Sequence, residues 1–265
     1  MFANPLGTCV RALVLIVSGL TLAACTDGPR DVRNYYFPVR DLAERGLVYV
    51  YDNTGTLPGP PQEFSYYLGV DVDTALHLAI THYDGAFEPR QQNREQVRND
   101  GAYLEEMLLL APDSAGRSIP VMADVLFPRT FPFYLDPAVP EAMGYRISFE
   151  PPSKAGTTNF VSLNRTFRGD TTVQVLGGRY DALVFDLAGE VSQRDPAAGD
   201  ISPQFTGYEI YAKGIGLVEY RRDLSVGASL GGKLSRRVGM DDWLAELKRT
   251  APDPTAPDDH SGHNH

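Results

Sequence analysis

The feature that most constrains the fold of this chain is a long series of short apolar segments, each ended by turn residues. The segments are rich in Val, Ile, Tyr, Phe and Thr, and Gly, Pro, Asp and Asn separate them. This pattern predicts an antiparallel meander and not an alternation of strands and helices. The predicted strands are Leu47–Asp52, Phe64–Asp73, Ala75–Tyr83, Gln92–Arg98, Ala102–Leu110, Ile119–Phe127, Tyr145–Glu150, Asn159–Arg168, Thr171–Leu176, Arg179–Gln193, Gln204–Lys213, Ile215–Asp223 and Lys233–Val238.

Alternation along these segments predicts which strands have a single apolar face. Leu183, Phe185 and Leu187 share one face of their segment, and Asp186 lies on the other. A half-buried antiparallel strand has this pattern. Residues 47–52 and 102–110 are apolar on both faces. These two segments therefore need cover on both sides, from a helix, a second sheet layer or a ligand.

Helix signals are few. Weak candidates are Val39–Arg45 and Pro137–Met143. The best candidate is Asp241–Arg249, which opens with two acidic residues and closes with two basic ones, as the helix dipole favours. Its apolar stripe of Trp243, Leu244 and Leu247 predicts that this C-terminal helix packs on the sheet.

The N-terminus predicts a secreted, lipid-anchored protein. One basic residue, Arg11, precedes an apolar run that is shorter than the ~20 residues of a bilayer span and suits a signal peptide over residues 1–24. The run ends in Leu22-Ala-Ala-Cys25, which resembles a lipobox and predicts cleavage between Ala24 and Cys25. The resemblance implies a diacylglyceryl group on the Cys25 thiol. An ordinary secretory signal with a chance cysteine, or a short membrane anchor, is the alternative.

The predicted anchor also suggests an address in the cell envelope. If Cys9 leaves with the signal peptide, Cys25 is the one remaining thiol, so the mature chain forms no internal disulfide. Thr26 follows Cys25, whereas aspartate at that position favours the inner membrane in enterobacterial lipoprotein sorting. That resemblance implies the outer membrane. The net charge of -10 makes nucleic acid a poor partner.

The chain divides into four predicted parts. Residues 1–24 are the signal peptide, residues 25–34 carry the lipidated cysteine and a tether, and residues 35–250 form one β-rich domain that includes the helix over 241–249. Residues 251–265 form a tail rich in His, Asp and Pro that we expect to be disordered. The tail histidines His260, His263 and His265 are weak metal-ligand candidates, because no scaffold fixes their geometry. We expect no bound metal and a solvated tail.

No motif in the chain indicates catalysis or a cofactor. The glycine-rich stretch from Gly227 to Leu234 nearly matches a phosphate-binding loop, but its last position lacks a hydroxyl and no helix opening follows. The glycine pair of Lys213-Gly-Ile-Gly216 suits a hairpin turn better than a dinucleotide site. His77 and His82 are five residues apart on one strand, so they point to opposite faces and cannot share a metal. We expect that the protein is not an enzyme and that it binds no cofactor.

Three stretches resemble hairpins of bacterial lipoproteins that are similar in layout to the lipoprotein-localisation-factor (LolA/LolB-like) superfamily. They are Leu176–Phe185, Tyr208–Tyr220, and Tyr36-Phe-Pro together with Gly46–Tyr51. The resemblance implies a mainly β fold, a strongly curved antiparallel sheet that forms an open half-barrel around an apolar cavity. We therefore expect an open half-barrel of about 11–13 strands with a few short helices and the C-terminal helix.

Two functions from different classes fit these expectations. The first is a binding protein whose half-barrel holds an acyl chain or another apolar ligand beside the membrane. The second is a non-catalytic scaffold or assembly lipoprotein that docks an envelope protein partner. A dry cavity of about 300 Å³ or more that opens to solvent would favour the first. A filled interior beside an exposed apolar patch of several hundred Å² would favour the second.

Overall fold

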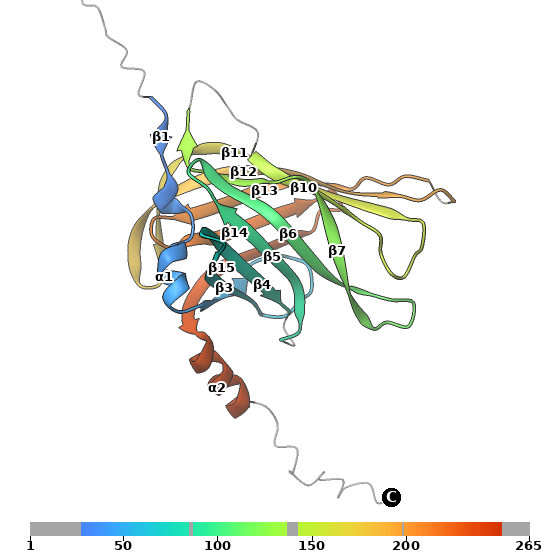
Figure 1. The fold of residues 1–265 in the computed structure, drawn as a ribbon, viewed down its shortest axis with the longest axis horizontal. Coiled ribbons are helices and arrows are strands. Elements are labelled where there is room, and N and C mark those ends of the chain that lie inside the picture. Colours follow the sequence, from blue (N-terminus) through green and yellow to red (C-terminus); the bar gives the residue numbers. More distant parts are fainter. Residues whose placement is uncertain (1–27, 85–86, 137–142, 198, 251–265) are drawn as a thin grey trace, which may run out of the picture.

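The main body of the protein is an antiparallel sheet that closes on itself into a barrel (Figure 1). The structure is a computed structural model that describes residues 28–84, 87–136, 143–197 and 199–250. Twelve of the 13 strands of this sheet make the ring, in the order β5-β4-β3-β2-β15-β14-β13-β12-β11-β10-β7-β6, and β6 pairs again with β5. The ring strands are β2 (Leu47–Asn53), β3 (Gln62–Val72), β4 (Ala75–Tyr83), β5 (Pro89–Val97), β6 (Gly101–Pro112), β7 (Ser118–Phe127), β10 (Met143–Phe149), β11 (Thr158–Val175), β12 (Gly178–Arg194), β13 (Gln204–Ala212), β14 (Gly216–Leu224) and β15 (Ser229–Gly239).

The predicted open half-barrel is therefore wrong. Strand β5 pairs with β4 on one side and with β6 on the other, from Gln91–Leu109 to Val97–Ala102. Strands β2 and β15, near the two ends of the domain, pair from Leu47–Gly239 to Asn53–Gly232. Each strand of the ring thus has two hydrogen-bonded neighbours, which removes the exposed edges that a half-barrel would keep.

The predicted strands are otherwise present, with two differences. Strand β11 runs unbroken where the sequence predicts two strands, and a register shift between Phe167 and Gly169 marks the predicted break. Three short strands were not predicted. Strand β8 (Arg129–Pro132) pairs with β6, and β1 (Arg30–Asp31) pairs with β9 (Tyr134–Leu135).

The N-terminal segment fills one end of the barrel. After β1 the chain forms the 3-10 helix η1 (Arg33–Tyr35) and then α1 (Val39–Glu44), and it buries aromatic and aliphatic side chains against inward-facing residues of the wall. We call residues 30–44 the plug. The Phe37 ring stacks on Tyr67, with 4.3 Å between the centroids. A Cβ at Gly216 would lie 2.5 Å from the Phe37 ring, so a glycine at this position lets the plug approach β14.

Both faces of β2 are covered, as its sequence predicts. Tyr49 and Tyr51 point into the barrel and pack against the plug, while Val48 and Val50 point outward. Helix α2 (Met240–Thr250) covers the outward pair with Trp243, which is 3% exposed. The predicted C-terminal helix and its packing on the sheet are confirmed.

Strand β6 is apolar on both faces in a different way. A register shift beside Glu105 changes its alternation, so that Leu104 and Met107 both belong to the interior. On the outer face Leu108 pairs with Met122 of β7, whose side chain is 59% exposed. This outer surface has no such cover among the described residues.

The remaining predictions of local structure have clear outcomes. The predicted helix from Val39 is α1, whereas residues 137–142 of the other weak candidate lie outside the described residues. The glycine-rich stretch forms a turn and the start of β15, so it provides no helix N-terminus for a phosphate. Lys213-Gly-Ile-Gly216 joins β13 to β14 as a hairpin turn. Within the described ranges, no helix has the length and apolarity needed to cross a bilayer.

The packing of α2 makes a testable prediction. The Trp243 ring lies 5.5–5.7 Å from the rings of Phe64, Tyr83 and Phe87. Trp243→Ala should therefore lower the free energy of unfolding by about 3–5 kcal/mol, measured by urea denaturation. The matched control is Leu244→Ala on the same helix, which is 41% exposed and should change stability by less than about 1 kcal/mol. Equal effects of the two substitutions would contradict this packing.

Candidate functional site

A buried ion pair joins β11 to β13 on the inner face of the barrel wall, across the intervening strand β12. Arg165 of β11 donates hydrogen bonds to both carboxylate oxygens of Glu209 on β13, at 2.6 and 3.3 Å, and a further one to the Thr130 carbonyl. The Tyr211 hydroxyl also donates to Glu209, at 2.9 Å. Burial alone would raise the pKa of Glu209, but the charge of Arg165 outweighs it and holds that pKa below its usual value. The pair stays ionised and well hydrogen-bonded.

A second buried carboxylate ties the plug to the wall. Glu95 of β5 accepts hydrogen bonds from the Tyr36 hydroxyl of the plug and from the Thr130 hydroxyl. Burial raises the pKa of Glu95, although both of these donors favour the ionised form. Because Thr130 also lies against Arg165 through its carbonyl, the plug, β5, β8 and β11 share one hydrogen-bonded layer. We call these buried groups the polar layer.

The two strand histidines lie on opposite faces, as predicted. His82 follows Leu78 and Ile80 on the inward face of β4, and its Nδ1 lies 2.9 Å from the Ser65 hydroxyl. His77 lies on the outer face, with its Nε2 3.1 Å from Glu105. Burial, together with the charge of Arg222, lowers the pKa of His82 from 6.5 to about 4. The interior thus holds His82 neutral at pH 7.

This pKa predicts a pH dependence of stability. In the unfolded chain His82 takes up a proton near pH 6.5, but in the folded barrel it does so only near pH 4. Between these values the unfolded chain binds more protons. The free energy of unfolding should therefore fall as the pH drops from 6.5 to about 4, by at most about 3 kcal/mol from this group. Urea denaturation at stepped pH measures it, and His82→Gln should have a shallower decline than wild type. Parallel curves would contradict the assignment.

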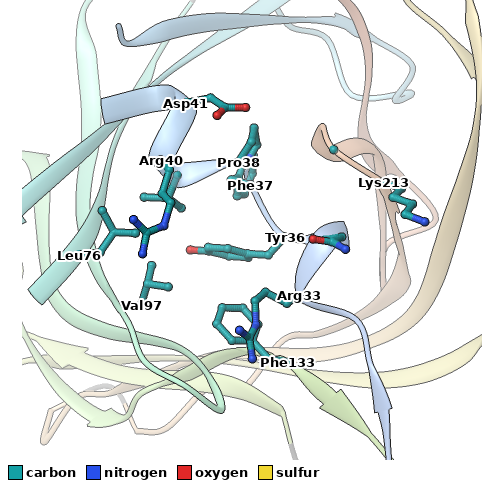
Figure 2. A pocket seen from close by; sticks show the side chains of 13 residues that line it. Arg33, Tyr36, Phe37, Pro38, Arg40, Asp41, Leu76, Val97, Phe133 and Lys213 are labelled. Atoms are coloured by element: carbon teal, nitrogen blue, oxygen red, sulfur yellow. The ribbon is translucent and has the colours of Figure 1, made fainter. Parts of the chain in front are cut away.

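A pocket of about 470 Å³ opens beside the plug (Figure 2). Its inner surface is apolar and aromatic, and its rim carries charges of the plug and of the turn between β13 and β14. The apolar lining is Tyr36, Phe37, Pro38, Val39, Leu76, Val97 and Phe133, and the polar lining is Arg33, Asn34, Arg40, Asp41, Lys213 and Gly214. In Figure 2 the Tyr36 ring extends across the pocket toward Leu76 and Val97. A lining of this kind suits an amphipathic ligand.

The rim of the pocket is cationic on balance. Arg33, Arg40 and Lys213 face one carboxylate, Asp41. Arg33 is held in place, because its guanidinium lies 5.5 Å from the centroid of the Phe133 ring and donates to the Tyr134 hydroxyl at 3.0 Å. Arg40 is exposed on α1. An acidic head group at this rim would meet more positive than negative charge.

The residues singled out by sequence are not in this site. Cys25 and the tail histidines His260, His263 and His265 lie outside the described residues. Among the residues that the structure places, no group of three or more His, Cys, Asp or Glu side chains could hold a metal ion. Glu95, Arg165 and Glu209 belong to no motif in the sequence. Only their positions could have indicated a buried role, because each charged residue lies where the strand's alternation predicts an inward-facing side chain.

Comparisons with known proteins give a likeness of fold. No protein-family model and no curated protein matches the sequence. One similar solved structure is a protein of Parabacteroides distasonis ATCC 8503 named provisionally as a lipoprotein (12% identity, 77% of this chain and 96% of that chain covered, TM-score 0.45). Another is a protein of Bacteroides fragilis NCTC 9343 named provisionally as an exported protein with a YmcC-like fold (14%, 73% and 96% covered, TM-score 0.47). Neither name is that of a LolA/LolB-like protein, so membership of that superfamily stays a prediction.

Proposed function

We propose that this protein is a non-catalytic lipoprotein of the cell envelope, anchored through Cys25, that holds an apolar or amphipathic ligand at the plugged end of its barrel. The observation that carries this proposal is the pocket of about 470 Å³ with an aromatic interior and a cationic rim. Its volume exceeds the ~300 Å³ at which small-molecule sites begin. An acyl chain with an acidic head group matches both the lining and the rim.

The position of the plug supports a ligand that comes from the membrane. Arg33 at the pocket rim is eight residues after Cys25 in the sequence. A fully extended chain covers at most about 3.6 Å per residue, so the pocket lies within roughly 30 Å of a lipid on Cys25. An anchored molecule would therefore keep this pocket near the bilayer surface. Thr26 after the cysteine favours the outer membrane as the location of the anchor.

A scaffold that docks an envelope protein is the second candidate. The observation in its favour is the outer surface of β7, where Met122, Leu126 and Phe127 are 59%, 52% and 39% exposed. Exposed apolar side chains on neighbouring strand positions often mark a protein contact. The pocket favours the first function, because the plugged half of the interior retains open space beside its own side chains.

The ligand proposal is tested by filling the pocket. Native mass spectrometry of the mature chain, with Cys25→Ser in place of the lipid, should detect co-purified lipid, and a fluorescent fatty-acid probe should bind and be displaced. Val97→Trp should weaken probe binding at least ~10-fold, because the indole occupies the pocket. Val226→Trp is the matched control, since Val226 is 80% exposed in the β14–β15 turn, and it should bind as wild type does. A wild-type protein that co-purifies with no lipid and binds no fatty-acid probe would contradict the proposal.

The anchor is tested by fractionation of the producing cells. Cys25→Ser should move the protein out of the membrane fraction or leave it unprocessed, because the thiol is the predicted site of lipid attachment. Intact-mass measurement should show a diacylglyceryl increment on wild type alone. Cys9→Ser is the control, since that residue leaves with the predicted signal peptide, and it should remain membrane-bound. A Cys25→Ser protein that still fractionates with membranes would count against the lipoprotein assignment.

A further inference from the structure

The two halves of the barrel interior differ in their access to solvent. In the plugged half, inward-facing side chains such as Tyr49 and Phe185 are fully buried. Beyond the polar layer, Val191 continues the inward face of β12, yet it is 43% exposed. Its partner Val161 and the inward-facing Leu109, Val125 and Phe149 are also partly exposed. The inner face of the wall is therefore accessible to solvent at this end, which we call the open half.

At the edge of the polar layer, Arg222 faces the open half with hydrogen-bond donors to spare. Its side chain is 30% exposed, and it pairs with Glu209 at 3.6 Å. Both oxygens of Glu209 already accept hydrogen bonds from Arg165. Among the described residues the Arg222 guanidinium makes no hydrogen bond within the usual distance; it lies over the Tyr220 ring, 5.1 Å from the centroid. Its donors remain available.

Two further polar groups face the same space. Tyr145 of β10 belongs to the inner apolar wall, and its hydroxyl has no hydrogen-bond partner in the described part of the chain. His82 uses Nδ1 toward Ser65, which leaves Nε2 without a described partner. Burial raises the pKa of Tyr145 and lowers the pKa of His82, and the charge of Arg222 favours the lower value in both, so Arg222 lies near each of these side chains. The nearby carboxylates already accept hydrogen bonds, Glu63 from the Tyr220 hydroxyl and Glu95 from the Tyr36 hydroxyl.

An apolar wall continues from these groups toward solvent. Leu104, Met107, Ala123 and Ile147 form a buried cluster, and Leu109, Val125, Phe149 and Val161 extend it with partly exposed side chains. Apolar surface beside donors that lack acceptors is the complement of an amphiphile with an anionic head.

We infer that the open half of the barrel is a second binding site, for an aliphatic carboxylic acid whose carboxylate accepts hydrogen bonds from Arg222 and Tyr145 and whose chain lies along the wall of Leu109, Val125, Phe149 and Val161. The planar guanidinium presents paired donors that match a carboxylate, whereas an alcohol of the same length would use at most one of them. The site is separate from the pocket beside the plug, since the polar layer lies between them.

The test compares dodecanoate with dodecanol by isothermal titration calorimetry at pH 8 on the mature chain carrying Cys25→Ser and Val97→Trp, because the indole fills the pocket beside the plug and leaves the second site to be measured alone. Dodecanoate should bind more tightly. Arg222→Gln should weaken dodecanoate at least ~10-fold and leave dodecanol unchanged, because only the carboxylate loses a charge-assisted hydrogen bond. Arg221→Gln is the matched control, because Arg221 points outward and donates to Asp223 at 2.7 Å. It should bind dodecanoate as the protein without this substitution does.

Further variants keep the inference open to failure. Tyr145→Phe removes one hydroxyl with little risk to folding and should weaken dodecanoate about 3- to 10-fold. Unchanged affinity for dodecanoate in both Arg222→Gln and Tyr145→Phe would overturn the inference. Absence of dodecanoate binding in the protein that carries only Cys25→Ser and Val97→Trp would also overturn it, and would leave the proposed function of the pocket standing.

Discussion

The width of a closed twelve-stranded ring is the constraint on which the rest of this structure depends. A barrel of about eight strands is just narrow enough for inward side chains to fill, and the diameter grows with strand number. This ring has twelve strands, so its own side chains leave space along the axis. The chain fills part of it with residues 30–44, whose aromatic rings pack against Tyr67 and Phe131. The plug is short, so one half of the barrel is packed except for the pocket beside the plug, and the inner wall of the other half is accessible to solvent.

The polar layer marks the boundary between these halves. Burying a charge costs several kcal/mol unless partners compensate it, so an interior of this kind needs complete hydrogen bonding. Glu209 achieves this with Arg165 and Tyr211, and Glu95 achieves it with Tyr36 and Thr130. The hydrogen bond from Tyr36 to Glu95 also determines how far the plug enters the barrel, because the hydroxyl and the carboxylate must lie within hydrogen-bond distance. Arg222, at the edge of this layer, has no such full set of partners.

Much of the fold follows from local patterns in the sequence. Alternation identified the inward face of β12 and the opposite faces of His77 and His82, and end charges identified α2. Closure could not be predicted in this way, because an open and a closed sheet have the same alternation and differ only in whether β2 pairs with β15. The site was equally hidden. Arg165 and Glu209 are far apart in sequence, and the residues of the plug have no period that separates them from a tether. Residues 30–34, assigned to the tether by sequence, contain β1 and the first two residues of η1.

The pairing of β2 with β15 also determines the order in which the molecule can be assembled. Leu47 meets Gly239 across this seam, so the ring lacks its last neighbour until almost the whole chain is available. Synthesis from the N-terminus produces the plug first and the seam last. Until the seam forms, Tyr36 and Phe37 have no interior to enter, and two strand edges stay unpaired. Contacts this distant in sequence form slowly. The incomplete barrel therefore exposes aromatic side chains near its N-terminus, and its solubility before closure depends on what covers those rings.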